Sequence, residues 1–217
     1  MRLRSFILPA IAAMVLSHGA LAATAPRTDL QQTPSGVYTL DPSHANVIWK
    51  ISHMGFSYLA GRFDTIAGTL TLDSAKPENS KLTAEVNTAS LNTHVSALDA
   101  KLVQEEFFNA KKFPKITFTA KRITLTGGNK GIIEGEVTLR GVTKPLSLDA
   151  TLVGAGVNPY FNVPTLGFSA LATLKRSDFG MNAYIPDVGD EVQLQIDAEF
   201  SLDKEATAKL ATTAKGK

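Results

Sequence analysis

Residues 44–73 read HANVIWKISHMGFSYLAGRFDTIAGTLTLD, and this stretch decides the fold. Val47, Trp49 and Ile51 lie on one side of its first half, alternating with the residues between them. A period of two places successive side chains on opposite faces of a β-strand, so one face of this strand is expected to be buried. The second half alternates in the same way after a loop rich in glycine and aromatic residues, residues 54–61. The stretch therefore predicts the first hairpin of an antiparallel β protein.

The rest of the chain repeats this plan. Later segments with alternating apolar residues begin at Leu82, Ile116, Ile133, Leu146, Phe168 and Val192. Only residues 92–112 differ, because Leu98, Leu102, Val103 and Phe107 recur there at helical spacing. The pattern predicts an all-β chain of about eight strands, with a helical insertion between strands 3 and 4. Such a meander can close into a barrel or fold into a sandwich, and alternation in nearly every strand favours the barrel.

The N-terminus carries the features of an export signal. Residues 1–22 read MRLRSFILPAIAAMVLSHGALA, with two arginines, an apolar run and small residues before Ala22. This order is typical of a cleaved secretory signal peptide. The alternative is a transmembrane anchor, but the apolar run at 6–16 contains Pro9 and is short for a bilayer-spanning helix. We therefore expect the protein to be secreted to the periplasm.

Composition limits the partners of the exported chain. Removing Arg2 and Arg4 lowers the count of lysine plus arginine from 22 to 20, which equals the 20 acidic residues. A chain of near-zero charge without a basic stripe is not expected to bind nucleic acid. There is no cysteine, so an apolar core rather than disulfides must stabilise the fold.

The chain divides into one domain and two flanking segments. Apolar alternation places the barrel domain at residues 37–203. The polar, proline-bearing residues 23–36 predict a disordered lead-in. The small and lysine-bearing residues 204–217 predict a flexible tail.

The predicted inward face mixes small and bulky residues. Its small members are Ala84, Gly135, Ala150, Ala170, Ala172 and Ala198. An eight-stranded barrel can fill its interior with side chains or keep room for one ligand, and small inward residues favour the ligand. Alternatively, aromatic residues on the same face fill the gaps, and the core is then solid. These aromatic residues are Trp49, Phe63, Phe118, Phe168 and Phe200.

Strand direction predicts which loops share an end of the barrel. In a simple meander the insertion at 92–114, the turn at 140–144 and the loop at 177–189 meet at one end. Because these include the longest loops, we expect the mouth there. The ionisable residues expected at this rim, where they would bind a ligand head group, are His53, Arg62, Asp99, Lys101 and Arg176. Alternatively, pairs such as Arg176 with Asp178 are ordinary solvated surface charge.

Signatures of catalysis and metal binding are weak. His44, His53 and His94 show no HxH or HExxH spacing, so we expect no metal site and no cofactor. Gly167-Phe168-Ser169 begins like a nucleophile elbow, but Leu171 stands where the motif requires glycine. We therefore expect no catalytic residues. The alternative is a lipid-modifying enzyme, in which His53 and Asp99 would form the catalytic pair.

Four blocks together resemble the YceI-like family. They are the opening stretch, SLNTHVSALDAKLVQEEFFNAKKFPKITFTA, GEVTLRGVTKPLSLDATL and LKRSDFGM, and they extend over residues 38–203. The resemblance implies an extended, lipocalin-like antiparallel barrel that binds polyisoprenoid-type lipids, in many members in the periplasm, with no established cofactor or catalytic residues. Where the family usually has Arg-Asp and then His-Leu, this chain has Leu98-Asp99 and Lys101-Leu102.

These observations predict a periplasmic protein that holds a long-chain isoprenoid, of polyprenyl or quinone type, or a similar amphiphile. The other alternative is a stress-response or interaction module that binds no ligand. The sequence does not decide whether two chains form a homodimer. The predicted apolar lining consists of Trp49, Ile51, Phe56, Phe63, Leu70, Val86, Leu102, Phe107, Phe118, Val137, Leu148, Phe168, Ala170, Ala172, Leu194 and Ile196.

Overall fold

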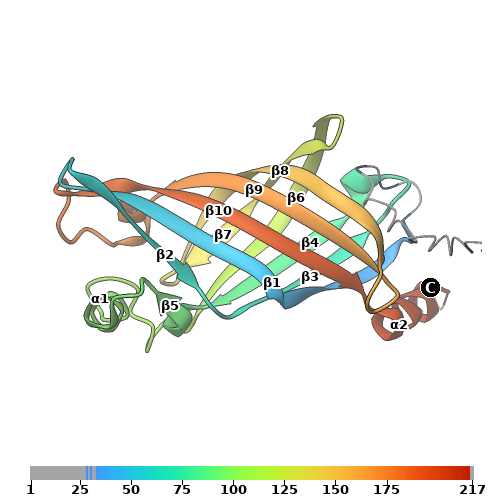
Figure 1. The fold of residues 1–217 in the computed structure, drawn as a ribbon, viewed down its shortest axis with the longest axis horizontal. Helices are drawn as coiled ribbons and strands as arrows, with labels where there is room; N and C mark the ends of the chain where they lie inside the picture. The colour runs from blue at the N-terminus through green and yellow to red at the C-terminus, as the bar shows by residue number, and fades with distance from the viewer. Residues whose placement is uncertain (1–27, 29, 31–32, 216–217) are drawn as a thin grey trace, which may run out of the picture.

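Eight long strands form one antiparallel sheet that closes on itself in the computed structural model (Figure 1). The structure describes residues 28, 30 and 33–215, so the predicted signal peptide lies outside the described residues. The eight strands are β1 (Gly36–His53), β3 (Ile66–Leu72), β4 (Lys81–Asn87), β6 (Lys115–Gly127), β7 (Lys130–Leu139), β8 (Val142–Asn158), β9 (Val163–Lys175) and β10 (Val188–Leu202). Each pairs with its neighbour in this order, and pairing of β10 with β1 closes the ring. The predicted eight-stranded antiparallel barrel is confirmed.

Strand β1 is long enough to pair with two strands along one edge. Its residues 36–39 pair with β3, and its residues 47–53 pair with β2 (Ser57–Phe63). The far edge of β2 pairs only with β5 (Leu91–Asn92) among the described strands. The sheet is therefore incomplete beyond β5, and the segment that follows β5 covers this part of the barrel.

The segment between β5 and β6 contains the short helix α1 (Ser96–Leu102). Three-residue and four-residue 3-10 turns also occur, at η1 (Pro77–Asn79), η2 (Thr88–Ser90) and η3 (Arg176–Phe179). The helical spacing over residues 92–112 predicts a longer helix than the structure has. After α1 the chain folds back in turns, because the amide of Phe108 donates to the carbonyl of Leu102 (3.0 Å) and Asn109 has a φ of 48°.

The C-terminal segment, which the sequence analysis predicts as a flexible tail, forms the helix α2 (Lys204–Lys215). The hydroxyl oxygen of Thr207 accepts a hydrogen bond from the amide of Val37 (2.9 Å), which fastens α2 to the start of β1. No helix among residues 28, 30 and 33–215 is long and apolar enough to cross a membrane.

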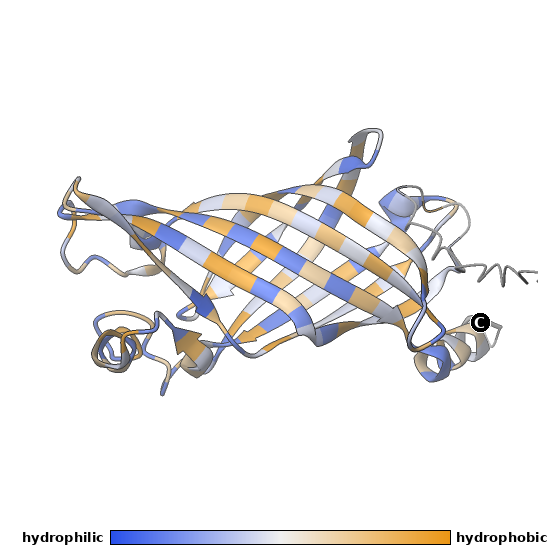
Figure 2. Ribbon diagram, in the orientation of Figure 1, coloured by the Kyte–Doolittle hydropathy of each residue, from blue (hydrophilic) through white to orange (hydrophobic). Residues whose placement is uncertain are grey.

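Hydrophobic and hydrophilic residues alternate along the strands of the barrel, as Figure 2 shows, and the buried residues are mostly apolar. Tyr38 is fully buried, and its hydroxyl donates to the carbonyl of Pro34 (2.7 Å). Burial raises the pKa of Tyr38 to about 12. Thr33 is also buried, so the chain contacts the barrel before β1 begins, within the range predicted as a disordered lead-in.

Candidate functional site

The barrel encloses a cavity of about 560 Å³. Its wall is built from the inward-facing residues of all eight long strands, and most of these residues are apolar. Ligand pockets in proteins commonly have volumes of about 300–1,000 Å³ and apolar walls. The interior of this barrel is therefore hollow on the scale of a ligand.

Small inward residues create this space. Ala84, Ala150, Ala170 and Ala198 all line the cavity, as the predicted inward face requires. The aromatic residues Phe118, Phe168 and Phe200 stand in the wall and leave the cavity unfilled. Gly135 and Ala172 are the exceptions among the small residues. The ring of Phe118 covers Gly135, and a Cβ built on Gly135 would lie 2.5 Å from that ring.

The cavity reaches solvent-exposed residues at the end of the barrel that carries α2 in Figure 1. Its rim there consists of the loop 74–80, the β6–β7 turn at 128–131 and Leu30. Ala75, Glu78 and Lys130 on this rim are exposed to solvent. We call this end the mouth. It lies opposite to the end where the sequence analysis placed the opening, so that prediction was wrong.

Aromatic side chains close the opposite end, which we call the plugged end and define by residues 93–114 and 176–187. The rings of Phe63 and Phe108 meet edge to face at 5.6 Å between centroids, and those of Phe107 and Tyr184 stack at 6.2 Å. Lys101 Nζ donates to the Tyr184 hydroxyl (2.7 Å). The long loops thus pack across the barrel end instead of framing an opening.

Two arginines fasten the plugged end through backbone carbonyls. Arg176 is 5% exposed, and its guanidinium donates to the carbonyls of Gly189 (2.8 Å), Met181 (2.9 Å) and Val188 (2.9 Å). Burial lowers the pKa of Arg176, although the charge of Asp190 opposes this shift. All three nitrogens of Arg176 therefore donate within the protein, and the residue does not line the cavity.

Arg140 acts in the same way from the β7–β8 turn. Its Nη1 donates to the carbonyls of Phe107 and Glu105 (2.8 Å to Glu105), and its Nε donates to that of Phe179 (3.1 Å). One side chain thus joins the two segments that form the plugged end. The sequence analysis gave Arg140 no role, because a turn residue carries no signal of the carbonyls that it will meet.

The other residues predicted for the head-group rim also lie away from the cavity. His53 ends β1 at the plugged end, and Arg62 Nε donates to Asp64 (2.6 Å) on the surface. The Asp99 carboxylate accepts from the amide (2.8 Å) and hydroxyl (2.6 Å) of Thr93, so it holds the turn before α1. Within the described part of the chain, no hydrogen bond or ion pair joins His53 to Asp99, the pair required by the enzyme alternative.

The residues predicted for the apolar lining fall into two groups, those that line the cavity and those that lie outside it. The residues that line the cavity are Leu70, Val86, Phe118, Val137, Leu148, Phe168, Ala170, Leu194 and Ile196. Those placed elsewhere are Trp49, Ile51, Phe56, Phe63, Leu102, Phe107 and Ala172. Trp49 occupies the space above Gly61, where a Cβ would lie 2.3 Å from its ring, and Phe56 is 90% exposed at the β1–β2 turn. Strand parity identified the inward face, but it could not locate the cavity along the barrel axis.

The mouth carries polar residues that the sequence analysis did not select: Ser74, Glu78, Ser80, Asn129 and Lys130. Their only signal in the sequence is that they belong to two turn segments, 74–80 and GGNKG. Residues 28, 30 and 33–215 include no cluster of three or more histidine, aspartate or glutamate side chains suited to a metal ion.

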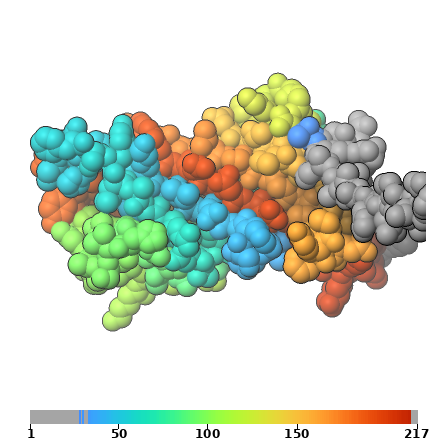
Figure 3. Space-filling model, in the orientation of Figure 1, coloured from blue at the N-terminus to red at the C-terminus, as the bar shows by residue number. Residues whose placement is uncertain are grey.

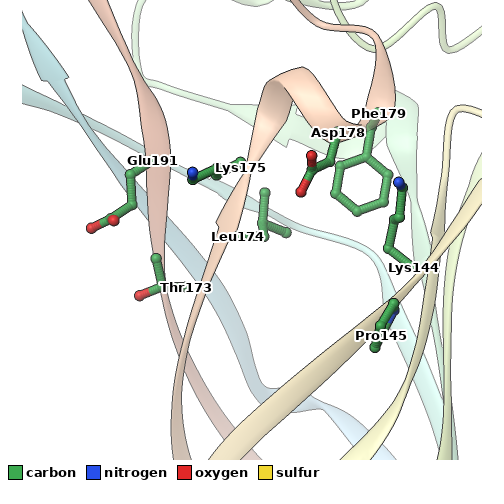
Figure 4. A pocket seen from close by; sticks show the side chains of 8 residues that line it. All are labelled: Lys144, Pro145, Thr173, Leu174, Lys175, Asp178, Phe179 and Glu191. Carbon is green, nitrogen blue, oxygen red and sulfur yellow. The ribbon is translucent and has the colours of Figure 1, made fainter.

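A second hollow of about 400 Å³ lies on the outside of the barrel between β8 and β9 (Figure 4). The two strands pair only from Asp149 and Leu171 toward the mouth, so they diverge at the plugged end. Leu174 and Phe179 project into this gap, flanked by charged residues of both signs. This hollow shares no lining residue with the barrel cavity.

Comparison with known proteins gives consistent results. A family model described as the YceI-like domain matches residues 38–200. A UPF0312 protein of Pseudomonas putida is 38% identical over 152 residues, which cover 69% of this chain and 79% of the relative. A UPF0312 protein of Shewanella baltica is 34% identical over 157 residues, covering 72% of this chain and 82% of the relative.

Solved structures show the same fold. The YCEI protein of Campylobacter jejuni has a TM-score of 0.64 and 32% identity, covering 71% of this chain and 91% of that protein. BcnA of Burkholderia cenocepacia has a TM-score of 0.67 at 22% identity, covering 74% of this chain and 98% of BcnA. A domain from Saccharophagus degradans described as polyisoprenoid binding has a TM-score of 0.60 at 14% identity, covering 76% of this chain and 98% of that domain. At such identities the last two likenesses concern the fold alone.

Proposed function

This chain belongs to the YceI-like domain family, and from that premise we propose that its barrel binds the hydrocarbon tail of a long-chain isoprenoid, of polyprenyl or quinone type. The observation that carries the proposal is the apolar cavity of about 560 Å³, open at the mouth and closed at the plugged end. The neighbour described as a polyisoprenoid binding domain shares the architecture, and the ligand class is supported by the cavity of this chain.

Binding would be driven by removing hydrocarbon from water. Each buried methylene group contributes about 0.8 kcal/mol, and part of this gain is lost in ordering the flexible tail and in association. The wall around Leu148 and Phe168 offers apolar contacts and few polar partners. A tail of a few isoprene units would therefore bind tightly without any specific hydrogen bond.

The polar end of the ligand would remain at the mouth. The hydroxyls of Ser74 and Ser80 and the amide of Asn129 offer hydrogen bonds there, and Lys130 and Glu78 carry opposite charges. Because the two charges balance, a neutral polar head group such as an alcohol or quinone suits this rim better than a diphosphate. Specificity for the head group would thus come from the turns at 74–80 and 128–131.

We also propose that the protein acts in the periplasm as a binding protein, exported by residues 1–22. A chain of near-zero charge without cysteine is compatible with that compartment. Sequestering or carrying a lipid between membranes would require a water-excluding interior, which the cavity provides.

The direct test is to identify what the protein carries. The protein is purified from its native host without detergent and extracted with organic solvent, and the extract is analysed by mass spectrometry. We expect a long-chain isoprenoid in stoichiometric amount. After delipidation, added polyprenol should raise the melting temperature, because a ligand that binds only the folded state stabilises it by mass action. Absence of long-chain lipid in repeated preparations, together with no thermal shift, would contradict the proposal.

A further inference from the structure

The tip of the β8–β9 hairpin presents two aromatic side chains to solvent. Tyr160 is 89% exposed and Phe161 is 72% exposed, and Val157 on the same hairpin is 60% exposed. Single exposed apolar residues are common, but adjacent exposed aromatic residues on a protruding tip indicate a contact surface.

The tip holds these side chains outward through its own hydrogen bonds. The side-chain oxygen of Asn158 accepts from the amides of Tyr160 (2.9 Å) and Phe161 (3.3 Å), and the amide of Asn162 donates to the carbonyl of Asn158 (2.8 Å). Asn162 takes the left-handed conformation that ends the turn, with a φ of 51°. The aromatic pair is thus presented by a formed turn.

The tip lies at the mouth end of the barrel (Figure 1). Lys130, at the start of β7, pairs with Thr151, and β8 continues past this point to Asn158. Pairing of Thr165 with Ser201 brings the start of α2 next to the tip, and Figure 3 shows both on the surface at this end. The tip therefore lies at the end of the barrel opposite to the plugged end.

Positive charge accompanies the aromatic pair. The sequence from residue 204 to residue 217 contains four lysines and one glutamate, a net side-chain charge of +3 in a chain whose exported part is close to neutral. Lys204 and Lys209 are exposed on α2, where Lys209 also forms an ion pair with Glu205 (2.7 Å). Aromatic side chains are favoured at the boundary between lipid and water, and lysines are attracted to anionic lipid head groups.

We propose that the β8–β9 tip and α2 dock the mouth end of the protein on a bilayer surface that contains anionic phospholipid. The proposal rests on the proposed function, since docking in this orientation would bring the mouth toward the membrane that supplies or receives the lipid. Tyr160 and Phe161 would insert at the head-group boundary while the lysines of α2 contact anionic head groups. A tail could then pass between bilayer and cavity over a short path through water.

The test compares two aromatic sites at opposite ends. The full chain, as its host cell processes it, is sedimented with vesicles of phosphatidylcholine and phosphatidylglycerol. The docking variant is Y160S/F161S, and the matched control is Phe56→Ser, because Phe56 is 90% exposed on the hairpin tip of the plugged end. We expect vesicle partition of Y160S/F161S to fall by about tenfold or more, with Phe56→Ser close to the unchanged protein.

Two further measurements distinguish a loss of membrane docking from a loss of folding or of lipid binding. All three proteins should have the same melting temperature and the same affinity for polyprenol in solution, since neither tip lines the cavity. Docking is overturned if the unchanged protein does not sediment with the vesicles, if Phe56→Ser loses as much as Y160S/F161S, or if the loss is a general effect of unfolding. Polyprenol affinity reports on the proposed function independently, because it is measured without a membrane.

Discussion

The two ends of this barrel are built from the same alternating strands but differ in what their connections do. At the plugged end, residues 93–114 and 176–187 pack aromatic rings across the opening, and the guanidinium groups of Arg140 and Arg176 bind backbone carbonyls. At the mouth, the short turns at 74–80 and 128–131 line the rim of the cavity, and residues such as Glu78 and Lys130 are exposed to solvent there. The difference teaches that long connections can close a barrel, while short ones can leave it open.

The largest expected effect is a loss of folding stability when the plugged end is disrupted. Arg176→Met leaves three backbone carbonyls without their buried donor, so we expect the free energy of unfolding to fall by about 3–5 kcal/mol. The measurement is urea denaturation followed by fluorescence. Arg176→Lys should restore little of the loss, because an ammonium group cannot reproduce the planar fork of donors.

The control for this prediction is a cation at the mouth. Lys130 is exposed, so Lys130→Met should change the free energy of unfolding by less than about 0.5 kcal/mol. Equal losses for Arg176→Met and Lys130→Met would show that the two ends do not differ in the way described.

The next largest effect is on lipid affinity, and it depends on how far the cavity extends toward the plugged end. Ala170 lines the cavity, whereas Ala172 faces the same way on β9 and lies outside it. A tryptophan at Ala170 occupies the space for a tail, so Ala170→Trp should weaken polyprenol binding by about 100-fold, or about 2.7 kcal/mol. Binding is measured by displacement of a fluorescent lipid from delipidated protein.

Ala172→Trp is the matched variant for this pair. It overpacks the apolar cluster toward the plugged end, so we expect lower stability, by about 1–3 kcal/mol, with nearly unchanged affinity. If Ala172→Trp weakened binding as much as Ala170→Trp, the tail would have to extend toward the plugged end.

The sequence predicted the strands and their inward face, but the position of the site along the barrel required the structure. Alternation fixes which side of a strand is buried, so Phe168 and Ala170 were placed correctly on the inner face. It contains no information on whether the chain after β5 folds over the barrel end or away from it. That depends on contacts between distant residues, such as Phe63 with Phe108, and on the carbonyl partners of Arg140.

For a related reason, the sequence did not show that the residues predicted for the head-group rim lie away from the cavity. Arg176 has the inward parity that the sequence analysis assigned to it, and it is buried, but its nitrogens are used by the loop that follows it. The polar residues that line the mouth, such as Ser80 and Lys130, lie in turns whose composition signals only a change of chain direction. Nothing in a single sequence distinguishes a cation that binds a loop from one that faces a ligand.

The smallest expected effect is a pH dependence at the plugged end. Burial by itself would raise the pKa of Asp190, but hydrogen bonds from the amide and hydroxyl of Ser177 and the charge of Arg176 outweigh it and hold the pKa below its usual value. A carboxylate with a lowered pKa contributes stability above the pKa of the unfolded state, about 4, and loses it as the pH falls through the folded value.

Denaturation of the unchanged protein and of Asp190→Asn across acidic pH checks this. The difference in free energy of unfolding between the two proteins should be constant at neutral pH and shrink below about pH 4. A difference that grows as the pH falls would mean that Asp190 is not stabilised as a carboxylate in the folded protein.

The most direct test locates the polar end of a bound lipid. The chain has no cysteine, so one dye can be attached through Thr126→Cys on the β6–β7 hairpin at the mouth, and another through Val95→Cys beside α1 at the plugged end. An isoprenoid carrying a short-range quencher on its head group is then bound to each labelled protein. We predict strong quenching of the dye at position 126 and little at position 95. Quenching mainly at position 95 would contradict the account, because the lipid would then enter through the end that the aromatic residues and arginines close.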